Sequence, residues 1–173
     1  GTMTSIRMSP GVSGLGLLAS VPARELMALA DPEDKNSDGI RGRLNHVWNA
    51  QSASVEIGRF GLKANQPGLR QQVAAALIGD MGITSSLFRQ QNCTPAQADC
   101  LRAPPGRRPE ISDADFASLI FYIEAIAPPA RRGGDATSER GEALFGEIGC
   151  ASCHRPSLTT GVVGAFPRAS NRE

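Results

Sequence analysis

Apolar positions recur at helical spacing in several stretches of the chain. The clearest stretch begins at Ser112, has Asp115 in the capping-box position and ends before Pro128. Its apolar face comprises Phe116, Leu119, Ile120, Ile123 and Ile126. Similar patterns predict helices over residues 67–79 and 138–148, the second with Ser138 as its cap. The chain is therefore expected to form several short helices.

Shorter patterns predict the remaining elements. Pro22 suits the first position of a helix through Ala30, whose buried side would consist of Leu26, Met27 and Leu29. Residues 44–48 and 54–60 have the pattern of two short strands separated by a polar turn, which predicts a small β-hairpin. Residues 103–109 are rich in Pro, Gly and Arg and form a predicted loop. Together these patterns predict a mainly α fold of short helices joined by long loops.

Composition limits the size and the partners of this fold. With 173 residues and 40% hydrophobic content, the chain fits a single domain, 1–173, with a modest core. Eighteen basic and seventeen acidic side chains give a formal charge of +1, so we expect no broad attraction to nucleic acid or an anionic membrane. No apolar run is long enough to predict a membrane span.

The beginning of the chain does not have the pattern of an export signal. The apolar segment 12–21 is interrupted by Ser and Gly and lacks a strongly basic lead. Gly1 and Thr2 before Met3 are typical of the remnant of an expression tag. We therefore expect that any native leader has been removed.

The most informative motif is Cys150-Ala151-Ser152-Cys153-His154. This CxxCH spacing is that of c-type haem attachment, in which two thioethers hold the ring and the histidine ligates the iron. Within the attachment segment 137–156, Leu144, Phe145 and Ile148 share one helical face, and Gly149 ends the helix before the first cysteine. The sequence thus predicts haem c held by Cys150, Cys153 and His154.

Two other uses of this motif have to be considered. A CxxC is also half of a zinc site, and Cys93 and Cys100 would complete four ligands of suitable type in a zinc-binding structural domain. It is also the spacing of a thioredoxin-like redox pair. The adjacent histidine and the preceding helix favour haem over both. A glycine-rich phosphate loop and a recognisable serine nucleophile motif are both missing from the sequence, so hydrolase chemistry gains no support.

A second candidate site lies in residues 31–39. Asp34, Asn36 and Asp38 alternate before Gly39, as in the first half of an EF-hand calcium loop, but Asn45 occupies the twelfth position where a glutamate is expected. Asp31 and Glu33 are candidates for the missing oxygens. The alternative is a solvated turn of Asp, Asn and Gly without a metal.

Four further residue types complete the candidate chemistry. His46 is the only other histidine and Trp48 the only tryptophan, so they are candidates for a second iron ligand and for a relay between redox centres. Met81 follows the predicted helix 67–79 and is a second candidate for the distal ligand. Cys93 and Cys100 enclose a short polar loop, and a local disulfide is their simplest use in an oxidising compartment.

Several runs of the sequence together resemble one family, the bacterial di-haem oxidoreductases, a peroxidase group related to the di-haem cytochrome c peroxidases and often labelled thiol oxidoreductases. The resemblance covers most of the chain and rests on residues 14–18, 38–43, 58–61, 70–72, 79–85 and 150–156. Members usually carry two CxxCH sites, whereas this sequence has one. The chain is therefore expected to be an internal fragment of a larger di-haem protein.

The resemblance implies a cytochrome c-like fold and a redox function. We expect electron transfer within a periplasmic di-haem oxidoreductase, with peroxide reduction as the enzymatic activity and simple electron carriage as the alternative. The implied partners are an electron donor or acceptor protein and a second haem in the rest of the full-length chain. Because few residues follow His154, the distal ligand is expected from outside this chain, with Met81 or His46 only as substitutes.

Overall fold

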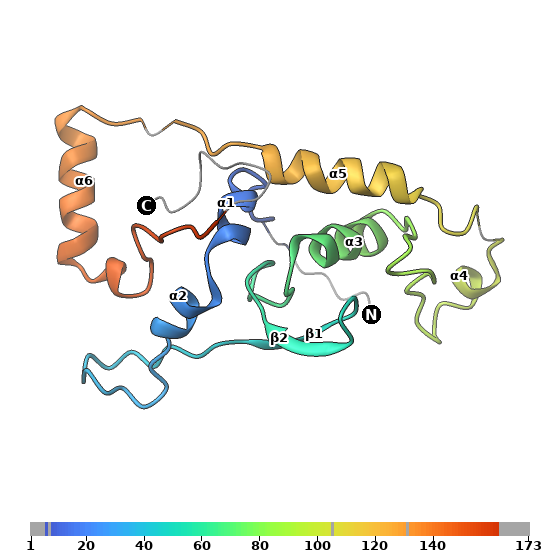
Figure 1. Cartoon of the computed structure of the whole chain (residues 1–173), viewed down its shortest axis with the longest axis horizontal. Helices are drawn as coiled ribbons and strands as arrows, with labels where there is room; N and C mark the ends of the chain where they lie inside the picture. The colour runs from blue at the N-terminus through green and yellow to red at the C-terminus, as the bar shows by residue number, and fades with distance from the viewer. Residues whose placement is uncertain (1–5, 7, 105, 131, 163–173) are drawn as a thin grey trace. The chain divides into compact units, whose positions relative to one another are not determined.

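The computed structural model describes residues 6, 8–104, 106–130 and 132–162, which are shown in colour in Figure 1. The chain divides into two compact units: unit 1 comprises residues 1–16 and 45–126, and unit 2 comprises residues 17–44 and 127–173. Most of the regular elements among the described residues are helices, and one small antiparallel hairpin accompanies them, in agreement with the predicted mainly α class. None of these helices has the length and hydropathy needed to cross a bilayer.

The hairpin of unit 1 pairs β1 (His46–Asn49) with β2 (Ser54–Ile57) in antiparallel register. Both strands are shorter than the predicted ranges but lie within or next to them. The turn is held by the Asn49 side chain, whose Oδ1 accepts a hydrogen bond of 2.9 Å from the backbone N–H of Gln51. The predicted hairpin is therefore confirmed.

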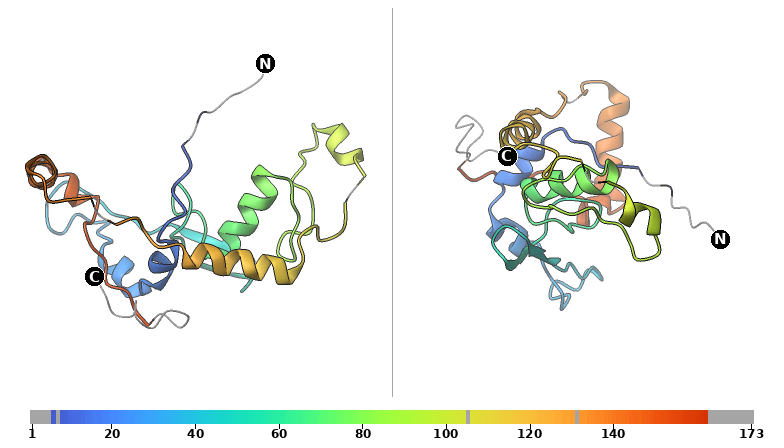
Figure 2. Two further views of the ribbon diagram at one scale, coloured as in Figure 1. Left: turned by 90° about the horizontal axis from the view of Figure 1, so that it is seen from above. Right: turned by 90° about the vertical axis from the view of Figure 1, so that its right-hand side faces the viewer.

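The core of unit 1 lies between α3 (Leu69–Asp80) and α5 (Asp113–Ala125), which run side by side in Figures 1 and 2. Phe116 of α5 is completely buried against α3 residues Val73, Ala74 and Leu77. Other apolar side chains pack around this cluster and are partly buried: Ile83, Leu87, Phe88, Ile111, Leu119, Ile120 and Ile123. The apolar face predicted for the helix after Ser112 is therefore the face of α5 that meets α3.

Local signals set the ends of these two helices. The Ser112 Oγ accepts a hydrogen bond from the N–H of Asp115 at 3.1 Å and donates one to its carboxylate at 2.6 Å, which confirms the predicted cap of α5. Helix α3 begins two residues later than predicted, because Gly68 is still extended and acts as the N-cap.

Polar side chains connect the hairpin to α3 within unit 1. The buried Gln71 donates hydrogen bonds to the Trp48 carbonyl and to the Gln66 side chain, both at 3.0 Å. Its own Oε1 accepts a hydrogen bond from the Ala50 N–H at 2.7 Å. A glutamine on the buried side of α3 thus forms hydrogen bonds with two backbone groups of the hairpin, the Trp48 carbonyl and the Ala50 N–H.

A further helix of unit 1, α4 (Ala98–Arg102), was not predicted. It lies in the segment that the Cys93–Cys100 disulfide closes, where the two Cα atoms are 5.9 Å apart. The disulfide occurs between the two cysteines that the sequence paired.

Unit 2 contains α2 (Ala23–Ala28), α6 (Ala136–Glu147) and a single 3-10 turn, η1 (Cys150–Ser152). It also contains most of α1 (Leu15–Ser20), which the sequence identified only as an apolar segment. The expectation that Met27 and Leu29 are buried was wrong, because their side chains are 50% and 36% exposed. A helix of six residues presents too few positions to bury a whole face.

Candidate functional site

The CxxCH motif follows helix α6. The N-cap of this helix is Asp135, whose Oδ1 accepts a hydrogen bond of 2.9 Å from the Ser138 N–H. The sequence assigned the cap to Ser138 itself, and this was wrong: Ser138 lies in the first turn and its hydroxyl donates back to Asp135 at 3.0 Å. The backbone hydrogen bond from Ser138, followed by that from its hydroxyl, lowers the pKa of the Asp135 carboxyl.

Gly149 ends α6 and turns the chain into the motif. It has a φ of +82°, a left-handed conformation that glycine adopts without the steric cost paid by other residues. The Cys150 carbonyl then accepts hydrogen bonds from the N–H groups of Cys153 at 3.2 Å and His154 at 2.9 Å. The motif is therefore a folded turn, in which the backbone of the histidine is bound to that of the first cysteine.

The side chains of the motif are accessible. Cys150 and Cys153 are free thiols, the first partly buried and the second exposed, and His154 is exposed. The His154 ring lies against the ring of Phe145, with centroids 6.2 Å apart and an interplanar angle of 62°. Phe145 of α6 thus positions the imidazole from one side.

An apolar surface of α6 accompanies the motif. Leu144, Phe145 and Ile148 are 48%, 40% and 66% exposed, although they share the face that the sequence identified as apolar. Three large apolar side chains beside two free thiols form a surface that gains stability when an apolar group covers it.

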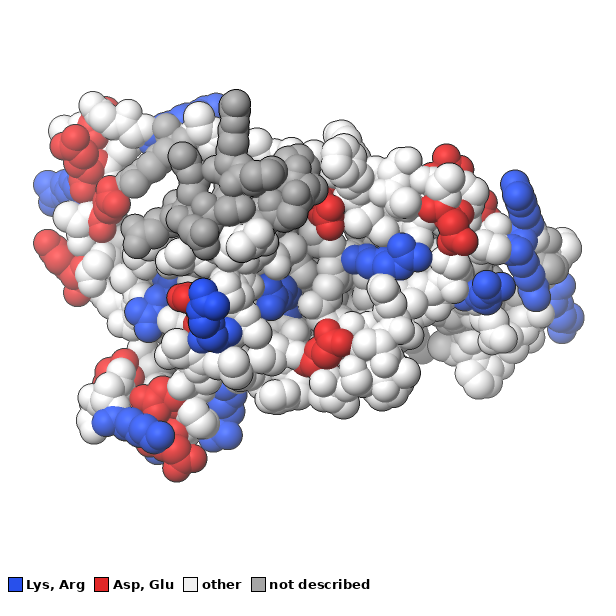
Figure 3. Space-filling view, viewed as in Figure 1, with Lys and Arg blue, Asp and Glu red and all other residues white. Residues whose placement is uncertain are grey.

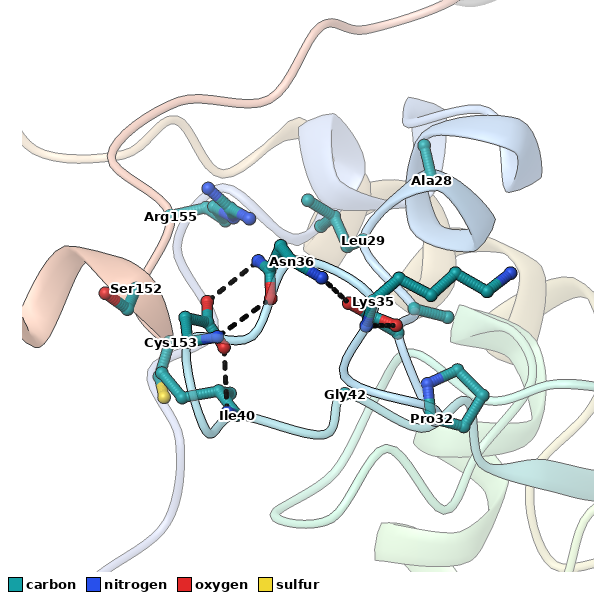
Figure 4. Close-up of a pocket in the computed structure, with 13 residues that line it drawn as sticks. Ala28, Leu29, Pro32, Lys35, Asn36, Ile40, Gly42, Ser152, Cys153 and Arg155 are labelled. Carbon is teal, nitrogen blue, oxygen red and sulfur yellow. Dashed lines mark hydrogen bonds between the residues drawn. The ribbon is translucent and has the colours of Figure 1, made fainter.

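A cavity of about 630 Å³ lies next to the motif, within unit 2 (Figure 4). One side of it is formed by Ser152, Cys153 and Arg155, and the other by residues 28–42. The sequence gave no sign of this cavity, because the loop after α2 has neither helical nor strand periodicity.

The predicted calcium loop forms part of this wall. Asp34 Oδ1 accepts a hydrogen bond from the Gly39 N–H at 3.1 Å, and Asp38 Oδ1 accepts one from the Ile40 N–H at 2.8 Å. The Asn36 side chain donates to Asp38 Oδ2 at 2.9 Å. These are the contacts of an Asp/Asn turn, the alternative that the sequence left open.

Within residues 6, 8–104, 106–130 and 132–162, no group of three or more His, Cys, Asp or Glu side chains gathers closely enough to hold a metal ion. In Figure 3, acidic and basic side chains are interspersed over the projection at the lower left, which Figure 1 shows to be the loop after α2.

The remaining candidates, His46, Trp48 and Met81, all lie in unit 1. His46 and Trp48 are exposed on β1, and Met81 is 67% exposed at the end of α3. Their roles as distal ligand or relay stay predictions. Cys93 and Cys100 are not available as thiolates in this structure, because they are joined in the disulfide.

A family model described as "di-haem oxidoreductase, putative peroxidase" matches residues 2–170. The chain belongs to this family. The match covers nearly the whole sequence, including the motif, the loop after α2 and the core of unit 1. No curated protein and no solved structure matches the chain.

Membership of the di-haem oxidoreductases implies a haem cofactor, and the geometry at the end of α6 fits one. Two free thiols and an exposed imidazole lie within one turn of five residues, 150–154. The exposed apolar side chains of α6 supply the kind of surface that a porphyrin covers. Both the donor set and its surroundings are therefore compatible with haem.

Proposed function

We propose that this chain carries one c-type haem within a di-haem oxidoreductase, and that it passes electrons between this haem and a second redox centre during peroxide reduction. The supporting observation is the CxxCH turn itself, with free thiols at Cys150 and Cys153, an exposed imidazole at His154 and an uncovered apolar face on α6. The family assignment supports the redox class of this function.

The residues of the motif have separate roles in this proposal. Cys150 and Cys153 would hold the haem as thioethers, formed by adding each S–H across a vinyl group with no leaving group and no net electron transfer. His154 supplies the proximal nitrogen, and Phe145 restricts the orientation of its ring. The bound haem supplies one-electron redox chemistry. Leu144 and Ile148, which are exposed on α6, would keep water from the part of a bound ring that they cover.

The proposed location is the periplasm. Covalent haem attachment and structural disulfides both belong to compartments outside the bacterial cytoplasm, and the Cys93–Cys100 disulfide supports this assignment. The proposed partners are an electron donor or acceptor protein and the second haem of the family.

Denaturing mass spectrometry tests the haem proposal directly. Protein produced in a host with c-type haem maturation should show one haem that stays attached after unfolding, and the double variant Cys150→Ser, Cys153→Ser should show none. Cys93→Ser, Cys100→Ser is the matched control, because it removes two sulfurs outside the motif and should keep the haem. Wild-type protein that binds zinc at this motif and carries no haem would contradict the proposal.

The reaction is tested on the haem-loaded protein. Peroxide reduction requires an iron position that peroxide can reach, so the absorption spectrum should change when hydrogen peroxide is added. A spectrum that peroxide leaves unchanged would favour electron carriage alone.

We also propose calcium as a ligand of Asp34, Asn36 and Asp38. The support is the alternation of these side chains before Gly39, the pattern of the first half of an EF-hand loop. Calcium should raise the melting temperature of the wild-type protein, and the rise should disappear in Asp38→Ala but persist in the control Asp99→Ala. Equal melting temperatures in calcium and in chelator would contradict this proposal.

A further inference from the structure

The side of the cavity opposite Cys153 is formed by residues 28–42. This side carries apolar side chains, among them Leu29 and Ile40, and its backbone is fixed by local hydrogen bonds. Asp31 donates its N–H to the Gly42 carbonyl at 3.0 Å, and its carboxylate accepts from the Lys35 N–H at 3.0 Å. At about 630 Å³ the cavity falls within the range of cofactor pockets, about 300–1,000 Å³.

Four charged side chains line this cavity: Asp31, Asp38, Lys35 and Arg155. The two carboxylates are already engaged by the loop, Asp31 by the N–H groups of Lys35 and Asn36 and Asp38 by the Ile40 N–H and the Asn36 amide. In contrast, neither cation forms an ion pair with another described residue. These hydrogen bonds leave the carboxylate charges in place, so the four charges sum to zero, but the two cations are the groups that can pair with an anionic group of a ligand.

The two cations occupy different sides of the cavity. Figure 4 shows Arg155 on the same side as Cys153 and Ser152, whereas the Lys35 side chain extends along the opposite side, past Pro32 and Ala28. An anionic group on a ligand held at Cys153 would thus meet Arg155 near its attachment point and Lys35 at its far edge.

We propose that this cavity receives the haem attached through Cys153, and that the Lys35 ammonium binds one of its propionate carboxylates. The inference rests on the proposed function. In haem, the vinyl groups that form thioethers lie on the edge of the ring opposite the propionates. A ring tethered at Cys153 and lying across the cavity presents its carboxylates on the side of Lys35. Leu29 and Ile40 then cover part of its apolar face.

The experiment measures the midpoint potential of the haem-loaded protein across the pH range. Loss of a positive charge near the haem favours the ferric form, so Lys35→Gln should have a lower midpoint potential than the wild type. A cation also lowers the pKa of the carboxylate that it binds. In Lys35→Gln the pH at which the potential becomes pH dependent should therefore move upward, and Lys35→Arg should restore both properties.

Arg41→Gln is the matched control. This substitution removes one positive charge from the same loop, as Lys35→Gln does. The Arg41 side chain is exposed and does not line the cavity, although its neighbours Ile40 and Gly42 do. Arg41→Gln should leave the midpoint potential and its pH dependence close to those of the wild type.

The outcomes separate this inference from the proposed function. Wild-type protein without covalent haem would overturn both. Haem-loaded protein in which Lys35→Gln and Arg41→Gln have the same midpoint potential and pH dependence would overturn the role of Lys35 alone. Failure of Lys35→Gln to retain haem, while Lys35→Arg and Arg41→Gln retain it, would support the inference.

Discussion

At the scale of single residues, Glu110 shows how one carboxylate joins two segments of unit 1. Its Oε2 accepts hydrogen bonds from the Thr84 N–H at 2.8 Å and the Thr84 hydroxyl at 2.9 Å. The Thr84 hydroxyl oxygen accepts in turn from the Glu110 N–H at 3.1 Å. These bonds, the backbone one first, lower the pKa of Glu110 below its usual value.

The lowered pKa of Glu110 predicts an acid-sensitive contribution to stability. This contribution is complete above the unfolded pKa, about 4.3, and is lost as the pH falls through the lower folded value. Glu110→Gln should therefore lower the urea midpoint at about pH 7 and reduce its dependence on pH between about 5 and 3. Unfolding curves across this range measure both effects.

Asp80→Asn is the control for Glu110→Gln, because Asp80 is an exposed carboxylate at the end of α3 in the same unit. It should leave the acid limb of the stability curve unchanged. The prediction fails if Glu110→Gln retains the full pH dependence of the wild type.

Residue-level signals were readable from the sequence where the structure depends on immediate neighbours. Ser112 and Gly149 act as the sequence predicted, since a cap and a left-handed turn need only their own few residues. Asp135 and Ser138 are both good capping residues three positions apart, and sequence alone could not decide between them.

At the scale of elements, the packing of α3 against α5 provides the core of unit 1. Phe116 has no exposed surface and lies among Val73, Ala74 and Leu77. The Arg70 guanidinium is also placed over its ring, 4.7 Å from the centroid. One aromatic side chain thus connects both helices and a cation.

Phe116→Ala should lower the free energy of unfolding of unit 1 by about 3–5 kcal/mol, because it removes a buried ring and leaves a cavity. Phe121→Ala makes the same substitution on the same helix at a side chain that is 56% exposed. It should cost about 1 kcal/mol or less. Chemical unfolding followed by circular dichroism measures both, and equal losses would contradict the assignment of this core.

Elements with strong periodicity were predicted, and those without it were missed. The sequence identified three features to within a few residues: α3 and α5 from their apolar patterns, and the hairpin from two strand-like segments around a polar turn. Helix α4 has only five residues in a polar, disulfide-closed segment, so no pattern could emerge. The apolar face of α6 was visible in the sequence, but its exposure was not, because burial depends on what lies opposite.

At the scale of the whole molecule, the family was recognisable from runs spread along the chain, and the match over residues 2–170 confirms it. The division into units was not foreseen, since each unit combines segments that are far apart in sequence. The cavity beside Cys153 has the same origin: its two sides come from residues 28–42 and 152–155. Contacts between distant segments produce no periodic pattern in the local sequence, so neither the units nor the cavity could be predicted from it.

The exposed face of α6 also bears on the fate of a newly made chain whose α6 no cofactor yet covers. A newly made chain presents Leu144, Phe145 and Ile148 to water next to two reduced sulfurs. Such a surface favours aggregation, and the sulfurs can cross-link one chain to another. If haem is attached as proposed, the yield of intact molecules would depend on how soon attachment follows synthesis.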